Sequence, residues 1–299
     1  MTILLELDEL RALEPPVCLV DARLAKDYAT GHIPGALHLD TFEFANERTE
    51  GNQFDAVLDT WQQMFHAAGL RRDESVVFYD AGTENRAARP ALMLRALGHE
   101  RVHVLHGGMA GWLDAGGALS GGAPRREPTR WPRGANPGAV VGIDTVREIL
   151  GRPEVVLLDV RSDEEWEGKK EMQGNPRLGR LPGARHLEWR SLIVRRDAWP
   201  DGTGSPRDGD QLLFRLHNPA ALRAMLAAVG VEDDTEVMLY CQKSHRASVV
   251  FIALEALGIR NARVYAGSFR EWSRRTDLPI EEGDRALPES LAAAPEALG

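Results

Sequence analysis

The sequence predicts an α/β protein made of two tandem domains, each a mostly parallel sheet covered by helices on both faces. Three observations predict this fold. The chain has 299 residues and 43% hydrophobic content, enough for two packed cores. Short Val- and Leu-rich runs such as VVLLDV and EVMLY alternate with helical patterns such as RASVVFIALEALG, the rhythm of a parallel sheet. The two halves of the chain also repeat each other.

The repeat is visible in two pairs of segments. Residues 17–40 and 155–189 each run from an apolar strand through Asp-x-Arg and a short acidic or aromatic helix to Ile/Leu-Pro-Gly-Ala. Residues 76–112 and 237–272 also match, and the Ala-Leu-Gly that they share recurs 160 residues later. A tandem duplication explains both pairs.

The domain limits follow from the repeat and from a change in composition. Residues 115–139 are rich in Gly and Pro and have no hydrophobic period, which is typical of a linker. We expect a first domain at 1–118, a linker at 119–138, a second domain at 139–285 and a flexible tail of low complexity at 286–299.

Charge and cysteine content exclude several classes of function. The net charge of -9 argues against a nucleic-acid partner, because a phosphate-binding surface needs excess basic charge. Two cysteines form no disulfide framework, and the histidines show no metal-ligand spacing, so we expect no metal and no other cofactor. No leader and no membrane-spanning run is visible, which predicts a cytoplasmic protein without a membrane partner. The duplication already makes an internal pseudo-dimer, so a monomer is expected.

The stretch YCQKSHRAS carries Cys241 from the end of an apolar strand into the start of an apolar helix. In open α/β sheets, ligands bind beyond the carboxyl ends of the strands, where helix N-termini offer unpaired N–H groups. The loop can curl its amides toward the sulfur, and Lys243, His245 and Arg246 add positive charge, so we expect a stabilised thiolate. The predicted anion site consists of Cys241, Gln242, Lys243, Ser244, His245 and Arg246.

Burial as a structural residue is the more common role of a lone cysteine. A packing residue, however, is rarely followed by Gln-Lys-Ser-His-Arg, so this role fits Cys241 poorly. Cys18, within the apolar VCLVDA, does fit a buried and unreactive thiol.

Together these residues resemble the rhodanese sulfurtransferases, in particular the tandem-domain kind that includes thiosulfate and 3-mercaptopyruvate sulfurtransferases. The resemblance rests on the two Asp-x-Arg segments, GHIPGA and GRLPGA, the loop YCQKSHRAS and the closing VYAGSFREW, and it covers nearly the whole chain. It implies that Cys241 takes a sulfane sulfur from a small anionic donor as a persulfide. The persulfide then passes this sulfur to cyanide, a thiol or a protein acceptor, in a double displacement.

Two other functions use similar parts. Protein tyrosine and dual-specificity phosphatases place a Cys-loop-Arg cradle on a helix N-terminus, but with five residues between Cys and Arg, whereas four separate Cys241 from Arg246. The shorter ring of amides suits a sulfur atom better than a phosphoryl group. The second alternative is a rhodanese-like module that carries sulfur or binds partners and has no turnover of its own.

The charge of the loop bears on the identity of the sulfur donor. Family members that use mercaptopyruvate tend to carry a small neutral loop, and those that use thiosulfate carry cationic side chains. Lys243 and Arg246 therefore favour thiosulfate, a dianion. Ser244 and His245 depart from both patterns, so 3-mercaptopyruvate remains the alternative donor.

Residues outside the loop provide further candidates. Arg177 and Arg180 precede LPGA in an insertion that the first half lacks, and an arginine of that region binds the donor in the family. Trp189 could form a wall of the pocket. Asp159 and Arg161 recur in the half without a nucleophile, so we expect a structural pair that holds the loop after the strand.

The first half has Asp80 where the second half has Cys241, with one loop residue gapped between the two copies. A carboxylate there could accept the amide hydrogen bonds that a thiolate accepts in the second half. The first domain is therefore expected to have no chemistry of its own and to contribute structure, including part of the substrate cleft.

Overall fold

The computed structural model describes residues 3–44, 48–83, 85–135, 138–195 and 214–282. The tail expected at 286–299 and part of the expected linker, 136–137, lie outside the described residues. Within the described part, no helix is long and apolar enough to cross a membrane.

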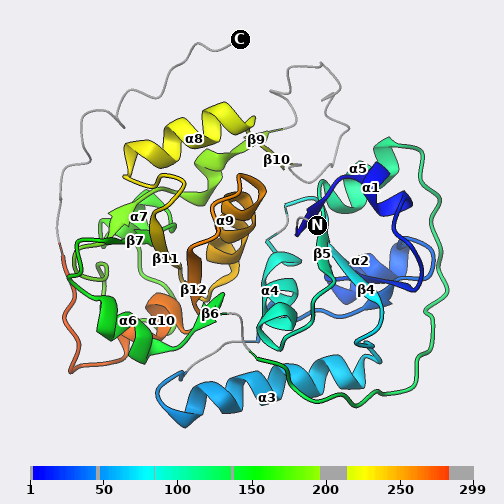
Figure 1. Cartoon of the computed structure of the whole chain (residues 1–299), viewed down its shortest axis with the longest axis horizontal. Helices are drawn as coiled ribbons and strands as arrows, with labels where there is room; N and C mark the ends of the chain where they lie inside the picture. Colours follow the sequence, from blue (N-terminus) through cyan, green and yellow to red (C-terminus); the bar gives the residue numbers. More distant parts are fainter. Residues whose placement is uncertain (1–2, 45–47, 84, 136–137, 196–213, 283–299) are drawn as a thin grey trace.

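The first half forms a five-stranded parallel sheet in the order β1-β5-β4-β2-β3 (Figure 1). Its central strand β4 is buried along its whole length, as the SVVFY run predicts. The strands are β1 (Leu4–Leu5), β2 (Val17–Asp21), β3 (Leu37–His38), β4 (Ser75–Tyr79) and β5 (Val102–Leu105). The helices are α1 (Leu7–Arg11), α2 (Ala25–Thr30), α3 (Asn52–Ala67), α4 (Ala88–Ala96) and α5 (Gly108–Asp114).

The second half repeats this topology in a parallel sheet with the order β6-β12-β11-β7-β8. Its strands are β6 (Val140–Val141), β7 (Val155–Asp159), β8 (Arg185–His186), β11 (Glu236–Tyr240) and β12 (Ala262–Tyr265). Its helices are α6 (Ile143–Ile149), α7 (Asp163–Trp166), α8 (Pro219–Ala228), α9 (His245–Ala256) and α10 (Ser268–Ser273). A 3-10 turn, Trp189–Leu192, and an antiparallel pair, β9 (Ile193–Arg195) with β10 (Phe214–Leu216), complete it. The predicted α/β fold and duplication are confirmed.

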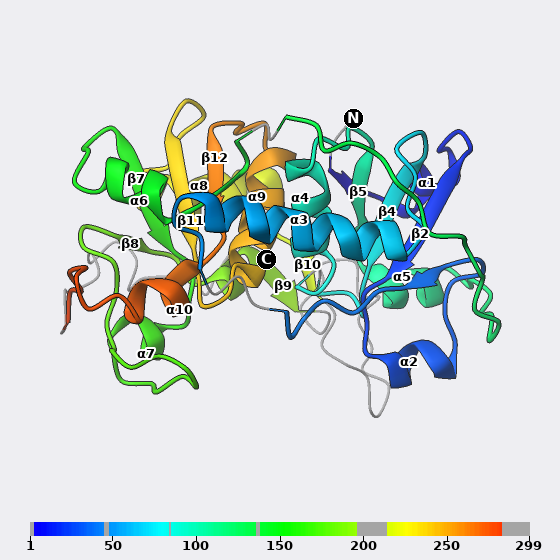
Figure 2. The same cartoon turned by 90° about the horizontal axis from the view of Figure 1, so that it is seen from below.

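The two halves meet through α4 and α9, which lie side by side between the sheets (Figures 1 and 2). Nine of the twelve residues of α9 are buried, so this helix is apolar on nearly all sides. Arg95 and Glu255, which are equivalent positions in the repeat, form an ion pair across the contact. One buried cluster contains residues of both halves.

The Gly- and Pro-rich connection is fixed to the first half. Its Trp131 is buried and donates an indole hydrogen bond of 3.0 Å to the carbonyl of Leu70. Arg126 forms a bidentate ion pair with the buried Glu74. Each sheet lies inside its predicted domain range, and the limits of those ranges stay a prediction.

A buried carboxylate also joins the halves. Glu271, on α10, accepts hydrogen bonds from the backbone N–H of Thr49 (2.5 Å) and from its hydroxyl (2.6 Å). The Tyr265 hydroxyl donates to the same carboxylate at 2.9 Å. The Thr49 hydroxyl also accepts from the N–H of Ile143 at 2.9 Å. Burial raises the pKa of Glu271 above its ordinary value, although the donors from Thr49 oppose this shift.

Replacing the Thr49 hydroxyl by a methyl group should weaken this junction. Thr49→Val leaves the N–H of Ile143 and one lone pair of Glu271 unpaired, so the free energy of unfolding should fall by roughly 1–3 kcal/mol. A buried carboxyl with a raised pKa loses stabilisation as the pH rises through that pKa, and the lost donor should raise the pKa further and extend this decline to higher pH. Denaturant titration at several pH values measures both effects.

The matched control is Thr60→Val, because the Thr60 hydroxyl bonds only within the exposed face of α3. It should change stability by less than about 0.5 kcal/mol. Equal losses in the two variants would contradict the role given to Thr49.

Candidate active site

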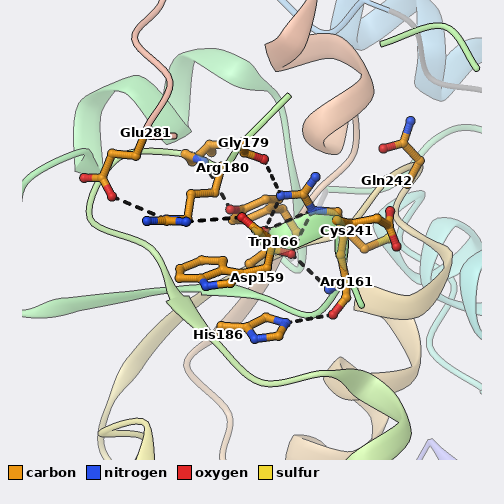
Figure 3. A network of polar contacts seen from close by, with 12 residues as sticks. Asp159, Arg161, Trp166, Gly179, Arg180, His186, Cys241, Gln242 and Glu281 are labelled. Atoms are coloured by element: carbon orange, nitrogen blue, oxygen red, sulfur yellow. Dashed lines mark hydrogen bonds and ion pairs between the residues drawn. The ribbon is translucent and has the colours of Figure 1, made fainter. Parts of the chain in front are cut away.

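Cys241 immediately follows β11 and lies four residues before α9 begins at His245. Its residue surface is only 1% exposed. The strand is central in its sheet, between β7 and β12, so the sulfur is held at the carboxyl edge of the sheet, as the sequence predicts. Figure 3 shows Cys241 beside the polar network that surrounds Asp159 and Arg161.

The loop after Cys241 is held by Ser268, at the start of α10. The Ser268 hydroxyl accepts hydrogen bonds from the N–H of Cys241 (3.3 Å) and of Ser244 (3.0 Å), and donates to the carbonyl of Tyr265 at 2.9 Å. Both serines have left-handed backbones, with φ of 64° at Ser244 and 53° at Ser268. This conformation costs free energy in residues other than glycine. Residues strained in this way are concentrated at functional sites.

The first turn of α9 supplies the donors of the site. The N–H groups of His245, Arg246 and Ala247 cannot bond within the helix, because no preceding turn offers them acceptors. The positive end of the helix dipole lies at the same place. An anion on the sulfur of Cys241 is therefore favoured by the geometry that the loop sequence predicts.

The three cationic residues of the loop behave differently from one another. Arg246 is mostly buried in a bidentate ion pair with Glu165, at 2.6 and 2.9 Å. Burial opposes the charge of Glu165, but the hydrogen bonds and charge of Arg246 lower the pKa of Glu165 to about 2. Burial also opposes the charge of Arg246, yet Glu165 and a negative charge on Cys241 raise the pKa of Arg246.

His245 does not add the positive charge that the sequence predicts. Burial, reinforced by the charge of Arg89, lowers the pKa of His245 well below its ordinary value, so the ring is neutral at pH 7. Its Nε2 lies 2.9 Å from the carbonyl oxygen of Phe42, in the first half. Lys243 has a side chain that is 26% exposed and lies 3.8 Å from the exposed Glu43.

The two remaining loop residues are held by hydrogen bonds. Gln242 and Asn175 exchange two side-chain amide bonds, of 3.0 and 2.7 Å, which tie the loop to the insertion before LPGA. The Ser244 hydroxyl is buried and donates to the carbonyl of Lys243 at 2.6 Å. These contacts give both side chains a role in the shape of the loop.

Arg177, predicted to bind the donor, is engaged with backbone carbonyls. Its guanidinium donates to the carbonyls of Ser273 (2.9 Å), Leu278 (2.8 Å) and Trp272 (3.0 Å), and to that of Arg275. These bonds attach the insertion to the segment after α10, so the structure gives Arg177 a structural role.

Arg180 and Trp189 are both buried. The guanidinium of Arg180 stacks on Trp166, with 4.3 Å to the ring centroid, and lies 3.6 Å from the carboxylate of Glu281 (Figure 3). In the first half, His32 stacks on Tyr28 at the same place in the repeat, which indicates a structural position. Trp189 belongs to the same buried cluster as Cys241. Donor binding by Arg177, Arg180 or Trp189 stays a prediction.

The Asp-x-Arg segments have the expected structural role. Arg161 pairs with Asp159 at 2.6–3.0 Å and donates to the carbonyl of Gly179 at 2.8 Å. Arg23 repeats these bonds with Asp21 in the first half, and donates to Gly31 in place of Gly179. Each pair holds the loop after its strand. Cys18 is also buried, and burial raises the pKa of its thiol to about 12.

In the first half, a carboxylate accepts the amides of the equivalent loop. Asp80 accepts from the N–H groups of Gly82 (2.8 Å), Thr83 (3.0 Å), Arg86 (2.8 Å) and Ala87 (3.4 Å). This is the arrangement that the sequence suggests for Asp80. The donors that the second half leaves for an anionic sulfur are here satisfied within the protein.

One residue beside the site was not identified from the sequence. Arg89, on α4 of the first half, is 1% exposed and donates a hydrogen bond of 3.1 Å to the carbonyl of Lys243. Its only signal in the sequence is a basic residue at the start of an otherwise apolar helical run, AARPALML. The contact joins positions 154 residues apart, and no periodicity predicts it.

The chain matches a known protein family in both of its halves. The profile of the Rhodanese-like domain matches the chain twice, over residues 5–115 and 143–275. The chain belongs to the rhodanese family. Each match spans four whole strands of one sheet, so the resemblance seen in the sequence is confirmed.

Related proteins are named as sulfurtransferases and, in one case, as a sulfur carrier. The chain is 28% identical over 279 residues to 3-mercaptopyruvate sulfurtransferase of Escherichia coli K12, covering 90% of this chain and 93% of the relative. It is 29% identical over 273 residues to thiosulfate sulfurtransferase of Azotobacter vinelandii, covering 91% and 93%. A third relative, sulfur carrier protein TtuD of Thermus thermophilus, is 26% identical over 278 residues, covering 86% and 87%.

A solved structure agrees in fold. The crystal structure of the 3-mercaptopyruvate sulfotransferase SseA from Escherichia coli superposes with a TM-score of 0.69 at 24% identity, covering 90% of this chain and 99% of the other. The two domain matches make the chain a tandem rhodanese, and the named relatives support the activity class of a sulfurtransferase.

Removing the Ser268 hydroxyl should impair activity more than stability. Ser268→Gly suits a backbone with φ of 53°, and the repeat counterpart is Gly108, with φ of 49°. The variant should keep the fold but release the amides of Cys241 and Ser244. Sulfurtransferase kcat/KM, measured with thiosulfate and cyanide, should fall about tenfold, the value of one hydrogen bond of roughly 1.4 kcal/mol.

Ser273→Ala is the control, because Ser273 is buried in the same helix and its hydroxyl bonds only to the carbonyl of Arg270. It should retain wild-type kcat/KM. If Ser268→Gly were as active as the wild type, the loop would not depend on the Ser268 hydroxyl.

Proposed function

We propose that this rhodanese transfers a sulfane sulfur from thiosulfate to cyanide or a thiol acceptor through a persulfide on Cys241. The observation that carries the proposal is a buried cysteine at the carboxyl end of β11, one short loop before the unpaired N–H groups of α9. Such a site stabilises an anionic sulfur before and after it takes up a second sulfur atom.

The reaction has two displacements. The Cys241 thiolate attacks the sulfane sulfur of thiosulfate, the S–S bond of the donor breaks, and sulfite leaves with the electron pair. The acceptor, cyanide or a thiolate, then attacks the outer sulfur of the persulfide. Thiocyanate or a new persulfide leaves, and the Cys241 thiolate is restored. Charge is conserved in each step, and no cofactor takes part.

The donor assignment rests on Lys243. The charge of Arg246 is shared with Glu165 and His245 is neutral, so Lys243 is the loop cation with an accessible side chain. A cation beside a partly desolvated site attracts a dianion such as thiosulfate more than a monocarboxylate such as mercaptopyruvate. The second candidate donor is 3-mercaptopyruvate, which is favoured by the Escherichia coli relative.

Sulfur transfer suits the site better than phosphate hydrolysis does. A phosphatase needs an arginine that can grip the phosphoryl oxygens with both arms, and Arg246 uses both terminal nitrogens on Glu165. The Thermus thermophilus relative is named as a sulfur carrier. Steady-state rates distinguish the two roles, because a carrier without turnover would show no sustained transfer from thiosulfate to cyanide. The proposed unit is a cytoplasmic monomer, since a reducing compartment keeps Cys241 available.

Persulfide formation can be measured directly. After treatment with thiosulfate, the intact mass of the wild type should increase by one sulfur atom, and Cys241→Ser should show no increase. Cys18→Ser is the matched control and should gain the sulfur, because the Cys18 thiol is buried with a raised pKa. Labelling of Cys241→Ser, or none in the wild type, would refute the assignment.

The donor is tested by neutralising Lys243. In Lys243→Met, kcat/KM for thiosulfate should fall about five- to tenfold, the effect of roughly 1–1.4 kcal/mol for one charge near a partly desolvated dianion. The loss with 3-mercaptopyruvate should be smaller. Lys169→Met, at an exposed lysine paired with Glu167, should change neither rate. A wild type that prefers mercaptopyruvate would overturn the donor assignment.

A further inference from the structure

A buried arginine of the first domain reaches the loop of the second. Arg89 lies on α4, and its side chain is among the largest that are fully buried. Its Nη2 donates to the carbonyls of Thr41 and Phe44, in its own domain, and its Nη1 donates to the carbonyl of Lys243 at 3.1 Å. Arg89 therefore connects the first domain to the backbone two residues after Cys241.

The charge of Arg89 has no carboxylate partner among the described residues. Within the described residues, its hydrogen bonds go to three neutral carbonyl oxygens. A buried cation in such surroundings is costly unless a negative charge lies nearby. Burial lowers the pKa of Arg89 to about 9, and the first of the negative charges that oppose this shift is that of Cys241, ahead of Glu43 and Asp40.

The other cationic groups of the loop are neutral, paired with a carboxylate or directed toward one. His245 is neutral, and the charge of Arg246 is shared with Glu165, whereas Lys243 extends toward exposed Glu43. The charged and titratable groups that face this region are Lys243, His245, Arg246, Glu165, Asp159, Arg89, Asp40 and Glu43. Arg89 is the member of this set that comes from the first domain and carries a fully buried positive charge.

We propose that Arg89 is a positioning residue for sulfur transfer: it fixes the carbonyl of Lys243 and sets a buried positive charge against the anionic sulfur of Cys241. The inference builds on the proposed function and gives the first domain a defined part in it. The reactive thiolate then depends on contact between the two domains. In the repeat, the position 160 residues after Arg89 is Val249, so only the domain without a nucleophile carries this arginine.

The test measures how readily Cys241 is alkylated by iodoacetamide as a function of pH, in the full chain carrying Cys18→Ser so that one thiol remains. Arg89→Gln and Arg89→Met should raise the pH at half-maximal rate by about one unit and, at pH values well below the wild-type midpoint, slow the reaction by about tenfold. Arg95→Met is the control. Arg95 lies on the same helix and forms an ion pair across the same interface with Glu255, so its loss should leave the midpoint unchanged.

Folded Arg89 variants with a wild-type midpoint would overturn the proposal. If neither Arg89 variant folds, the proposal is tested instead by comparing how the stability of Cys241→Ser and of its parent depends on pH. A thiolate paired with a buried cation stabilises the fold increasingly as the pH rises through the alkylation midpoint, and Cys241→Ser should lack this gain. An equal pH dependence of stability would refute the pairing. Alkylation needs no sulfur donor, so these results stand apart from those of persulfide formation.

Discussion

The structure depends on the packing of α4 against α9. This contact forces α9 to be apolar on nearly every side, because one face covers its own sheet and another meets the first domain. Under the proposed function, the first turn of the same helix also has to offer its N–H groups to an anionic sulfur. The short polar loop between Cys241 and α9 reconciles the two demands. It places the thiol of Cys241 in the buried interior without exposing the apolar helix.

Both copies of the fold place a loop between the central strand and the following helix, one residue longer in the first copy, and they differ in what accepts its amides. In the first domain the carboxylate of Asp80 accepts four backbone N–H groups, so the loop is complete without a ligand. In the second domain Ser268 accepts the amides of Cys241 and Ser244, and the proposed function assigns the N–H groups that begin α9 to the anionic sulfur. The two copies thus differ in the side chain that faces the loop amides, a carboxylate in the first and a cysteine in the second. The Asp-Arg pairs, which serve the fold, are the same in both.

The features that could be predicted from the sequence are those with a local or repeated signal. The parallel sheets follow from apolar runs, the structural role of Asp159 and Arg161 from their recurrence, and the position of Cys241 from the strand-loop-helix pattern. The electrostatics could not be predicted in this way. Arg246 pairs with Glu165, which lies 81 residues away in the sequence, and burial keeps His245 neutral. Arg89 reaches the loop from the other domain. Such effects depend on tertiary contacts that produce no periodic pattern in the sequence. The loop sequence therefore predicts three cations, whereas in the structure Lys243 is the one with an accessible charge in the loop.

In the proposed site, the sulfur of Cys241 is an anion held by amides of its own domain and by the charge of Arg89 from the other. A crystal structure of the full chain after soaking with thiosulfate tests this most directly. We expect one additional sulfur atom on Cys241, within hydrogen-bonding distance of the N–H groups that begin α9, while Arg89 keeps its bond to the carbonyl of Lys243. An unmodified Cys241, or a persulfide turned away from these amides with Arg89 displaced from the loop, would contradict it.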